Sequence, residues 1–487
     1  MSVRVPLTRS TPEEQGVPTS ALLAFLDAAG GTLNDLHSLM VLRHGAVIAE
    51  GWWAPYSAER PHMLFSLSKS FTATAVGFAI ADSLLSLDDR VVDLLPNDAP
   101  DEIDANLGAM TVRHLLTMTT GHAEDTMATL TREEDNWAQS ILATPVEHVP
   151  GSTFVYNSGA TYLLAAILLE LTGEDLLDYL TPRLLDPLGI EGATWEHCPR
   201  GVASGGWGLS LTTEDIALFG QLYLQRGQWN GVQVVPAAWI DASTAAQVVN
   251  GDFPQGDDHG HGYGYQFWRC QHGAYRADGA FGQMCIVMPD QDAVVVFTSS
   301  LPDTQLAREA VWTHLLPALS GTGPRDADAP AAASLHAVLG GLELPTPHGR
   351  DHTAAAARTA GIRYRFAETP AGIESVTLEG DELTIELDGE AQRIRLGFDA
   401  WTLGTAPFAD SLVTHGLSSP VAASGAWIAD STFVARVQYV EKPFALQFEL
   451  VFDGGEDGAG RPDTVTLTVT QNVSFDETLI ARGIGVR

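Results

Sequence analysis

Residues 65–73 read Phe65-Ser66-Leu67-Ser68-Lys69-Ser70-Phe71-Thr72-Ala73, a Ser-x-x-Lys pattern that opens an apolar segment without proline. The serines suit helix capping, and the Ala-, Phe- and Ile-rich text predicts a largely buried helix over 66–85. Residues three apart on a helix share a face, so we expect the Ser66 hydroxyl within reach of the Lys69 amine. Such an amine can accept the serine's proton, while the helix N-terminus stabilises developing negative charge. Ser66 is therefore the candidate nucleophile and Lys69 its base.

Lysine is otherwise almost absent from the chain. Only Lys69 and Lys442 occur, so 24 of the 26 basic residues are arginine. The alternative interpretation of the pattern is a solvated lysine beside an N-cap serine. A solvated position could as well have used arginine, whereas a proton acceptor could not, because arginine stays charged. The rarity of lysine therefore favours a catalytic Lys69.

Composition narrows the class of protein. The 487 residues include 61 Asp and Glu against 26 Lys and Arg, a formal net charge of −35, which excludes nucleic-acid binding through phosphate neutralisation and disfavours an anionic membrane surface. We find no signal-peptide pattern and no apolar run of membrane-spanning length, and we expect a soluble, cytoplasmic protein. The three cysteines, Cys198, Cys270 and Cys285, lack CxxC spacing, so we expect reduced, inert thiols, no metal and no cofactor.

Two architectures follow one another along the chain. Residues 1–320 are expected to form an α+β catalytic domain, with helices packed on an antiparallel sheet. The pattern predicts hairpins over 39–48 and 283–299 and helices near 112–118, 159–172, 213–226 and 236–246. Residues 321–334 have the Gly, Pro, Asp and Ala content of a linker, and the alternative is that part of this segment forms an ordered strap. Short period-two segments then fill 335–487 and predict an all-β barrel or sandwich of lipocalin size.

A second chemical motif is Tyr156-Asn157-Ser158, which lies where a Gly-containing turn at 150–153 enters a helix. A phenol at such a junction can project into a cleft and share or relay a proton with a nearby lysine. The alternative is a packed tyrosine with a satisfied hydroxyl.

Together these motifs resemble the serine β-lactamase-like hydrolases of the class C type, which include DD-peptidases, D-aminopeptidases and carboxylesterases. The matching text covers most of residues 10–315. Besides Ser66 to Lys69 and Tyr156, it comprises 111–121, 150–173, 186–190, 205–215 and 277–283. The C-terminal β-domain resembles, by pattern, the lipocalin-like domain often attached to such hydrolases.

The resemblance implies a role for each matched residue. Ser66 would form an acyl-enzyme that water later cleaves, while Lys69 and Tyr156 would handle the proton. The backbone N–H groups of Ser66 and Ala280 would form the oxyanion hole, beside Gly279 on an edge strand.

Two departures from the family pattern concern the substrate. Ser158 stands where the family usually has an amide, and Ala277 stands where it usually has a Lys or His. Without that cation, a substrate carboxylate has no obvious partner unless Arg276, Arg269 or His272 supplies one, and Arg276 could equally be a solvated strand residue. We take this as evidence against an efficient β-lactamase.

Two further features have alternative interpretations. The stretch Asp257-Asp258-His259-Gly260-His261 suggests a metal cluster, but histidines two apart in a glycine-rich loop do not fix a tetrahedral site, so an active-site rim loop is favoured. His122, Glu124 and Asp125 are placed at the rim on the same grounds. The aromatic residues Trp207 and Tyr263 to Trp268 would line an acyl pocket or pack in the core.

The sequence therefore predicts a metal-independent serine hydrolase acting on a small carboxylic ester or a D-amino-acid amide or peptide. A β-lactamase or DD-peptidase-like activity is the alternative, and a non-catalytic binding module of the same fold is the alternative from another class. No nucleic-acid or membrane partner is expected, and a homo-oligomer is possible.

Overall fold

The computed structural model describes residues 6–487 except 32, 34, 131–135, 252, 254–256, 322, 352, 368, 370, 388, 408–417, 457–461 and 476. The chain divides into two compact units. The first contains Pro61–Ser299, Asp303–Gly341 and the chain before Trp53, and the second contains Leu342–Arg487 with the short segments Trp53–Arg60 and Ser300–Pro302. Within the described residues, no helix is both long enough and apolar enough to cross a bilayer.

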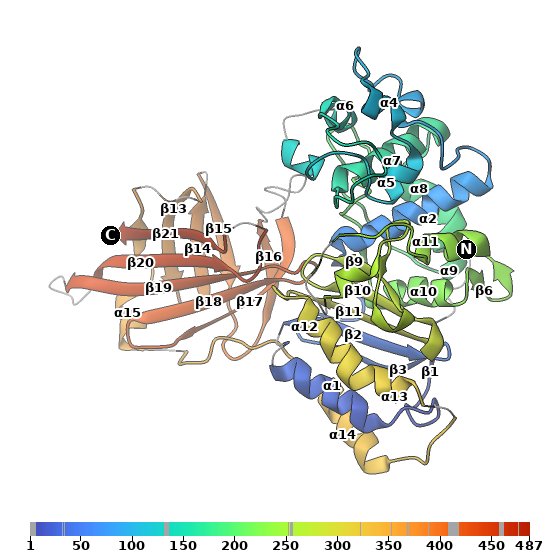
Figure 1. The fold of residues 1–487 in the computed structure, drawn as a ribbon. Coiled ribbons are helices and arrows are strands. Elements are labelled where there is room, and N and C mark those ends of the chain that lie inside the picture. Colours follow the sequence, from blue (N-terminus) through green and yellow to red (C-terminus); the bar gives the residue numbers. More distant parts are fainter. Residues whose placement is uncertain are drawn as a thin grey trace. The chain divides into compact units, whose positions relative to one another are not determined.

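The first unit is built on a seven-stranded sheet assembled from both ends of its sequence (Figure 1). The strand order is β1-β3-β2-β11-β10-β9-β8, and apart from the parallel pair β1 and β3 the neighbours are antiparallel. The strands are β1 (Thr8–Arg9), β2 (Leu36–Arg43), β3 (Ala46–Trp52), β8 (Trp268–Arg269), β9 (Tyr275–Gly279), β10 (Gln283–Met288) and β11 (Ala293–Ser299). Both predicted hairpins are confirmed as β2 with β3 and β10 with β11.

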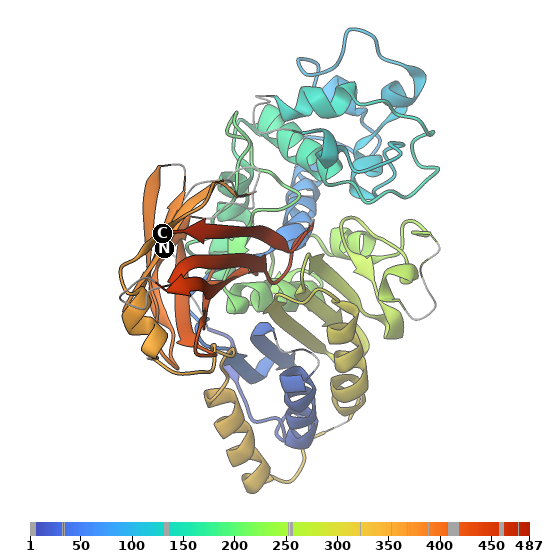
Figure 2. The ribbon, with the colours of Figure 1, turned by 90° about the vertical axis from the view of Figure 1, so that its left-hand side faces the viewer.

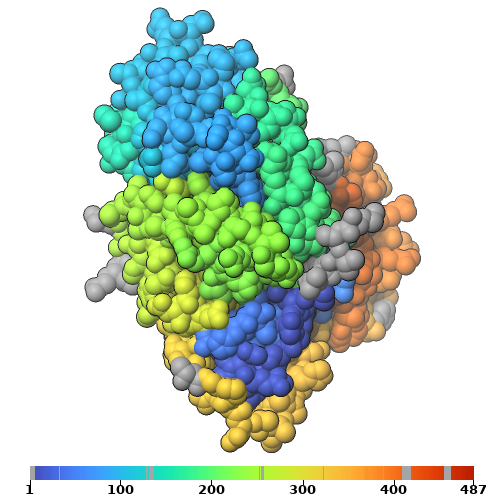
Figure 3. Space-filling view, turned by 90° about the vertical axis from the view of Figure 1, so that its right-hand side faces the viewer, coloured from blue at the N-terminus to red at the C-terminus, as the bar shows by residue number. Residues whose placement is uncertain are grey.

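Every residue of β2, β10 and β11 is buried, because helices cover both faces of this sheet. Helix α10 (Thr213–Leu224) packs on β10 and β11, and its Gly220 allows the close approach, since a Cβ there would lie 2.5 Å from the Cys285 Sγ. The ends of the unit also meet, as helix α1 (Thr19–Gly31) packs on α14 (Ala329–Gly340); Figure 3 shows these ends, blue and yellow, next to each other. The predicted α+β architecture is confirmed.

The predicted helix at Ser66 is α2 (Ser68–Ala81), which is buried from residue 68 to 79. A helix that is apolar on all sides must lie in a core, and α2 packs against α7 (Ser158–Thr172). The other expected helices are α5 (Val112–Leu116), α10 and α11 (Ala237–Thr244).

The second unit is a ten-stranded antiparallel sheet that closes almost completely into a barrel (Figure 2). Consecutive strands pair as a meander, and β12 pairs with β21, while β15 and β16 approach at the seam. The strands are β12 (Arg363–Arg365), β13 (Ile373–Glu379), β14 (Glu382–Leu387), β15 (Glu390–Arg395), β16 (Thr402–Pro407), β17 (Ser418–Trp427), β18 (Thr432–Tyr439), β19 (Ala445–Glu456), β20 (Pro462–Gln471) and β21 (Leu479–Val486). Of the two predicted forms, the barrel is the one observed.

The limits of the units differ from the expected domain boundaries in two places. Residues 321–334, expected as a linker, include the start of α14, which belongs to the first unit because it packs on α1. Residues 53–60, expected within the catalytic domain, belong to the barrel unit, where the Tyr56 hydroxyl donates to the Lys442 carbonyl (2.8 Å) and accepts from Gln438 (2.8 Å).

Candidate active site

Ser66 lies in a 3-10 turn, η1 (Phe65–Leu67), directly before α2. Phe65 has a φ of +49°, in the left-handed region that large side chains avoid, so the backbone next to Ser66 is strained. The turn is tied to a neighbouring segment, because the Leu64 N–H donates to the Leu209 carbonyl (2.8 Å) and the Leu209 N–H donates to the Ser68 Oγ (3.1 Å). These contacts fix where the Ser66 hydroxyl emerges.

Lys69 lies one turn further on, with only 1% of its surface exposed. Its Nζ atom lies 2.8 Å from the Ser66 Oγ, 3.1 Å from the Ser158 Oγ and 2.8 Å from the Gly206 carbonyl oxygen. The carbonyl can only accept, so it orients the amine, while each hydroxyl can donate or accept. A neutral Lys69 can therefore accept the Ser66 proton, and the resulting ammonium group can donate hydrogen bonds to the Ser158 hydroxyl and the Gly206 carbonyl.

Burial lowers the pKa of Lys69 from its ordinary value to about 7, and the charge of Asp125 opposes the shift. Tyr156 moves in the opposite direction, since burial raises its pKa, while an interaction with the Ser66 side chain opposes this shift. The two pKa values are therefore pushed apart, so that just above neutral pH the amine is largely unprotonated while the phenol retains its proton. Titratable groups in such distinct states suit separate base and acid roles.

The Tyr156 ring is held between Lys69 and an aromatic cluster. The Lys69 Nζ lies 4.8 Å from the ring centroid, and the Trp268 ring stacks on Tyr156 at 5.4 Å with an interplanar angle of 24°. Tyr263 contacts Tyr156 edge-on at 6.2 Å and Trp268 at 4.8 Å. Of the aromatic residues expected in an acyl pocket or the core, Tyr263 and Trp268 thus pack against the Tyr156 ring.

Asn157 and Ser158 contact different partners. The Asn157 Oδ1 caps α7 by accepting from the Ala160 N–H (3.3 Å), and it also accepts from the Thr126 Oγ1 (2.9 Å). Ser158 reaches Lys69, and its own N–H donates to the Asp125 Oδ1 (2.9 Å). The residue expected at the rim, Asp125, therefore positions Ser158 as well as influencing the pKa of Lys69.

The Gly279 end of β9 abuts the chain that leads into Ser66. A Cβ atom at Gly279 would lie 2.1 Å from the Leu64 carbonyl oxygen, so only glycine permits this approach. The turn that follows is held by Ser299, whose Oγ donates to the carbonyls of Phe281 (2.7 Å) and Gly282 (3.0 Å). This arrangement brings Ala280 beside the Ser66 turn.

Arg276 does not lie on the surface as a solvated strand residue; it is fully buried. Its Nε donates to the Asp278 Oδ2 (2.6 Å) and its Nη1 to the Cys270 Sγ (3.1 Å). Arg269 likewise donates to backbone carbonyls, those of Thr244 (2.9 Å) and Gly273 (3.1 Å). Both arginines considered as replacements for a cation at Ala277 thus already donate to protein acceptors, while the buried Nη2 of Arg276 has no acceptor among the described residues.

The loop at 257–261 contributes to the same buried network. His259 pairs through Nδ1 with the Asp257 Oδ1 (2.8 Å), its Nε2 lies 3.7 Å from the Asp278 Oδ2, and Arg308 approaches Asp278 to 3.8 Å. The hydrogen bond to Asp257 orients this histidine. In the part of the chain that the structure describes, no group of three His, Cys, Asp or Glu residues is arranged to hold a metal ion.

Sequence reasoning missed the Gly206 carbonyl as a partner of Lys69. A backbone acceptor carries no residue-type signal, so the motif Gly205-Gly206-Trp207 indicated a functional segment but not its role. The close packing of this loop is visible only in three dimensions, where a Cβ at Gly206 would lie 2.9 Å from the Ser158 carbonyl oxygen.

Known proteins resemble this chain in sequence and in fold. The profile of the Beta-lactamase family matches residues 33–319. The chain is 26% identical over 322 residues to 6-aminohexanoate-dimer hydrolase of Paenarthrobacter ureafaciens, covering 60% of this chain and 80% of that one. It is 28% identical over 307 residues to penicillin-binding protein 4 of Amycolatopsis lactamdurans, covering 55% and 76%.

Among solved structures, SurE with D-Leu matches both units, with 19% identity, a TM-score of 0.50 and coverage of 95% of this chain and 98% of that one. At this identity the likeness concerns the fold alone. The family profile spans more than half of the chain, and the chain therefore belongs to the Beta-lactamase family.

Proposed function

We propose that this chain is a serine hydrolase that cleaves a small carboxylic ester, or a D-amino-acid amide or peptide, through an acyl-enzyme on Ser66. The observation that carries the proposal is the contact between the buried Lys69 Nζ and the Ser66 Oγ, at 2.8 Å, with the pKa of Lys69 lowered to about 7. An amine with that pKa is a competent base near neutral pH.

The proposed reaction moves one proton from the serine to the leaving group. As the Ser66 Oγ attacks the acyl carbon, its proton passes to Lys69, whose new charge is stabilised by the Gly206 carbonyl and the Ser158 hydroxyl. The backbone N–H groups of Ser66 and Ala280 would bind the oxyanion. Tyr156, still protonated, would donate to the departing alkoxide or amine, and Lys69 would restore its proton. Water then cleaves the ester by the reverse sequence.

The preference for an acyl group without a carboxylate rests on three positions. Ala277 is buried and uncharged, Arg276 is paired with Asp278, and Arg269 serves two carbonyls. A β-lactam or a D-Ala-D-Ala terminus carries a carboxylate, whose burial without a partner is costly. The relative named 6-aminohexanoate-dimer hydrolase supports hydrolysis as the activity, without specifying this chain's substrate.

Covalent labelling tests the mechanism, and a substrate panel tests the substrate class. A fluorophosphonate should add its mass to Ser66, and Ser66→Ala should abolish the adduct while the melting temperature stays unchanged. Absence of labelling in a folded protein would favour a binding module instead. In a panel of p-nitrophenyl esters, D-amino-acid anilides and nitrocefin, hydrolysis of nitrocefin as the best substrate would contradict the preference for acyl groups without a carboxylate.

A further inference from the structure

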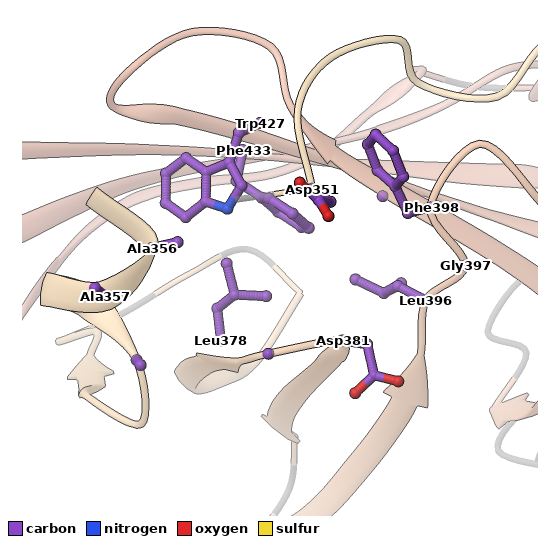
Figure 4. A pocket seen from close by; sticks show the side chains of 13 residues that line it. Asp351, Ala356, Ala357, Leu378, Asp381, Leu396, Gly397, Phe398, Trp427 and Phe433 are labelled. Atoms are coloured by element: carbon purple, nitrogen blue, oxygen red, sulfur yellow. The ribbon is translucent and has the colours of Figure 1, made fainter. Parts of the chain in front are cut away.

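The barrel of the second unit contains a cavity that the proposed reaction does not use (Figure 4). It lies between helix α15 (Ala354–Thr359), the turn after β13 and the ends of β17 and β18, and its volume is about 310 Å³. Ligand pockets in proteins range upward from roughly 300 Å³, so this cavity suits one small molecule.

The walls of the cavity are apolar. The side chains of Leu378, Leu396, Trp427 and Phe433 lie around it, and each is buried (Figure 4). Trp427 and Phe433 meet edge to face, with ring centroids 5.4 Å apart. Gly425 allows the Phe433 ring to lie close to its strand, because a Cβ atom there would lie 2.7 Å from the Phe433 Cζ. Aromatic and aliphatic walls of this kind favour the hydrocarbon part of a ligand.

One charge faces this apolar space. The Asp351 carboxylate points toward it from the loop before α15, whereas the Asp381 carboxylate at the rim is turned away (Figure 4). None of the described residues that line the cavity is basic, and no ion pair of Asp351 is found among the described residues. A carboxylate next to the indole of Trp427 offers an ammonium group both a charge-assisted hydrogen bond and a cation–π contact.

We propose that this cavity binds a small organic ammonium ion with an apolar body, of the arylalkylamine class. The ammonium group pairs with Asp351, and the hydrocarbon body lies against Trp427, Phe433, Leu378 and Leu396. The cavity is a binding site separate from Ser66, and its occupation does not depend on the proposed hydrolysis.

The test is a calorimetric titration of the full-length protein with 2-phenylethylamine in 0.15 M KCl, with 3-phenylpropionate as the anionic counterpart. We expect saturable binding of one amine at this site, and binding of the acid at least tenfold weaker. Asp351→Asn should weaken amine binding at least fivefold, and Asp381→Asn by less than twofold. Because the whole protein is strongly acidic, equal weakening by both variants would show general attraction of cations and would overturn the proposal.

A second pair of variants locates the bound amine. Ala356→Phe should fill the cavity from α15 and abolish saturable binding, whereas Ala354→Phe, at an exposed position of the same helix, should leave it unchanged. Ser66→Ala should also leave it unchanged. Binding that survives Ala356→Phe in a protein with an unaltered melting curve would place the amine elsewhere and overturn the proposal.

Discussion

The Nζ atom of Lys69 lies 2.8 Å from the Oγ atom of Ser66 and 3.1 Å from the Oγ atom of Ser158. One buried amine therefore contacts two hydroxyls, and both belong to residues at a helix start, because Ser66 lies directly before α2 and Ser158 is the first residue of α7. Burial lowers the pKa of this amine to about 7, so its protonation state changes within the range where most hydrolases are assayed.

The first prediction concerns pH. We expect kcat/KM to rise with pH through about 7, because Lys69 must lose its proton before it can accept one from Ser66. Lys69→Arg should lower kcat/KM by about 10³-fold or more at every pH, since a guanidinium cannot become neutral. A stopped-flow ester assay over pH 5–9 measures both. A profile that stays level across pH 7 would argue against Lys69 as the base.

The second prediction concerns Asp125, whose charge raises the pKa of Lys69. Asp125→Asn retains an oxygen to accept the Ser158 N–H and removes the charge, so the midpoint of the pH profile should fall by up to about one unit. Glu124→Gln, at the exposed neighbouring position, is the control and should leave the midpoint in place. An unchanged midpoint in Asp125→Asn would limit Asp125 to a structural role.

The third prediction separates the acid from the base. Tyr156→Phe keeps the ring that stacks on Trp268 but removes the proton donor. The value of kcat/KM should fall by about 10²-fold for an ethyl ester, whose leaving group needs a proton, and much less for the p-nitrophenyl ester of the same acid. Equal losses on both esters would show that Tyr156 acts before the leaving group departs.

The fourth prediction concerns the approach of β9 to the Ser66 turn. Gly279→Ala places a Cβ within 2.1 Å of the Leu64 carbonyl oxygen, so the strand and the turn must separate. We expect a loss of about 1–3 kcal/mol in unfolding free energy and slower fluorophosphonate labelling of Ser66. Gly30→Ala is the matched control, because nothing lies within 4 Å of a Cβ there. Labelling at the wild-type rate would show that the oxyanion site does not depend on Gly279.

The fifth prediction concerns a buried histidine pair behind the site, in which the His37 Nδ1 lies 3.0 Å from the His62 Nε2. Burial lowers the pKa of His62 to about 4, whereas an unfolded histidine titrates near 6.5. The unfolded chain therefore binds more protons between these values, and stability should be lost as the pH falls from about 6.5 to 4.

Melting curves over that range measure the effect of the histidine pair. His62→Gln should reduce the dependence of the unfolding free energy on pH. Between pH 6.5 and pH 4 the variant should lose less stability than the wild type, by on the order of 3 kcal/mol. His336→Gln, at an exposed position, should keep the full slope. If the slope is the same in His62→Gln as in the wild type, other groups carry the acid sensitivity.

Much of the fold could be predicted from local patterns. Both hairpins of the catalytic unit, the helix after Ser66 and the β-rich C-terminal part follow from apolar periodicity and turn residues, which act over a few neighbours in the chain. The domain limits could not be predicted in this way. Residues 53–60 have no compositional mark, and their place in the barrel unit depends on contacts such as that of Tyr56 with Lys442, 386 residues later.

The sequence by itself determined the contact between Ser66 and Lys69, because the two residues lie one helical turn apart and local geometry brings them together. The tertiary structure decided everything that adjusts this pair. The Gly206 carbonyl, Ser158 and Asp125 come from segments more than 50 residues away, and the pKa of Lys69 depends on burial, which no single segment sets. It also decided that Arg276 faces Asp278 inside the unit rather than solvent, because strand pairing and packing, not residue type, choose which way a side chain points.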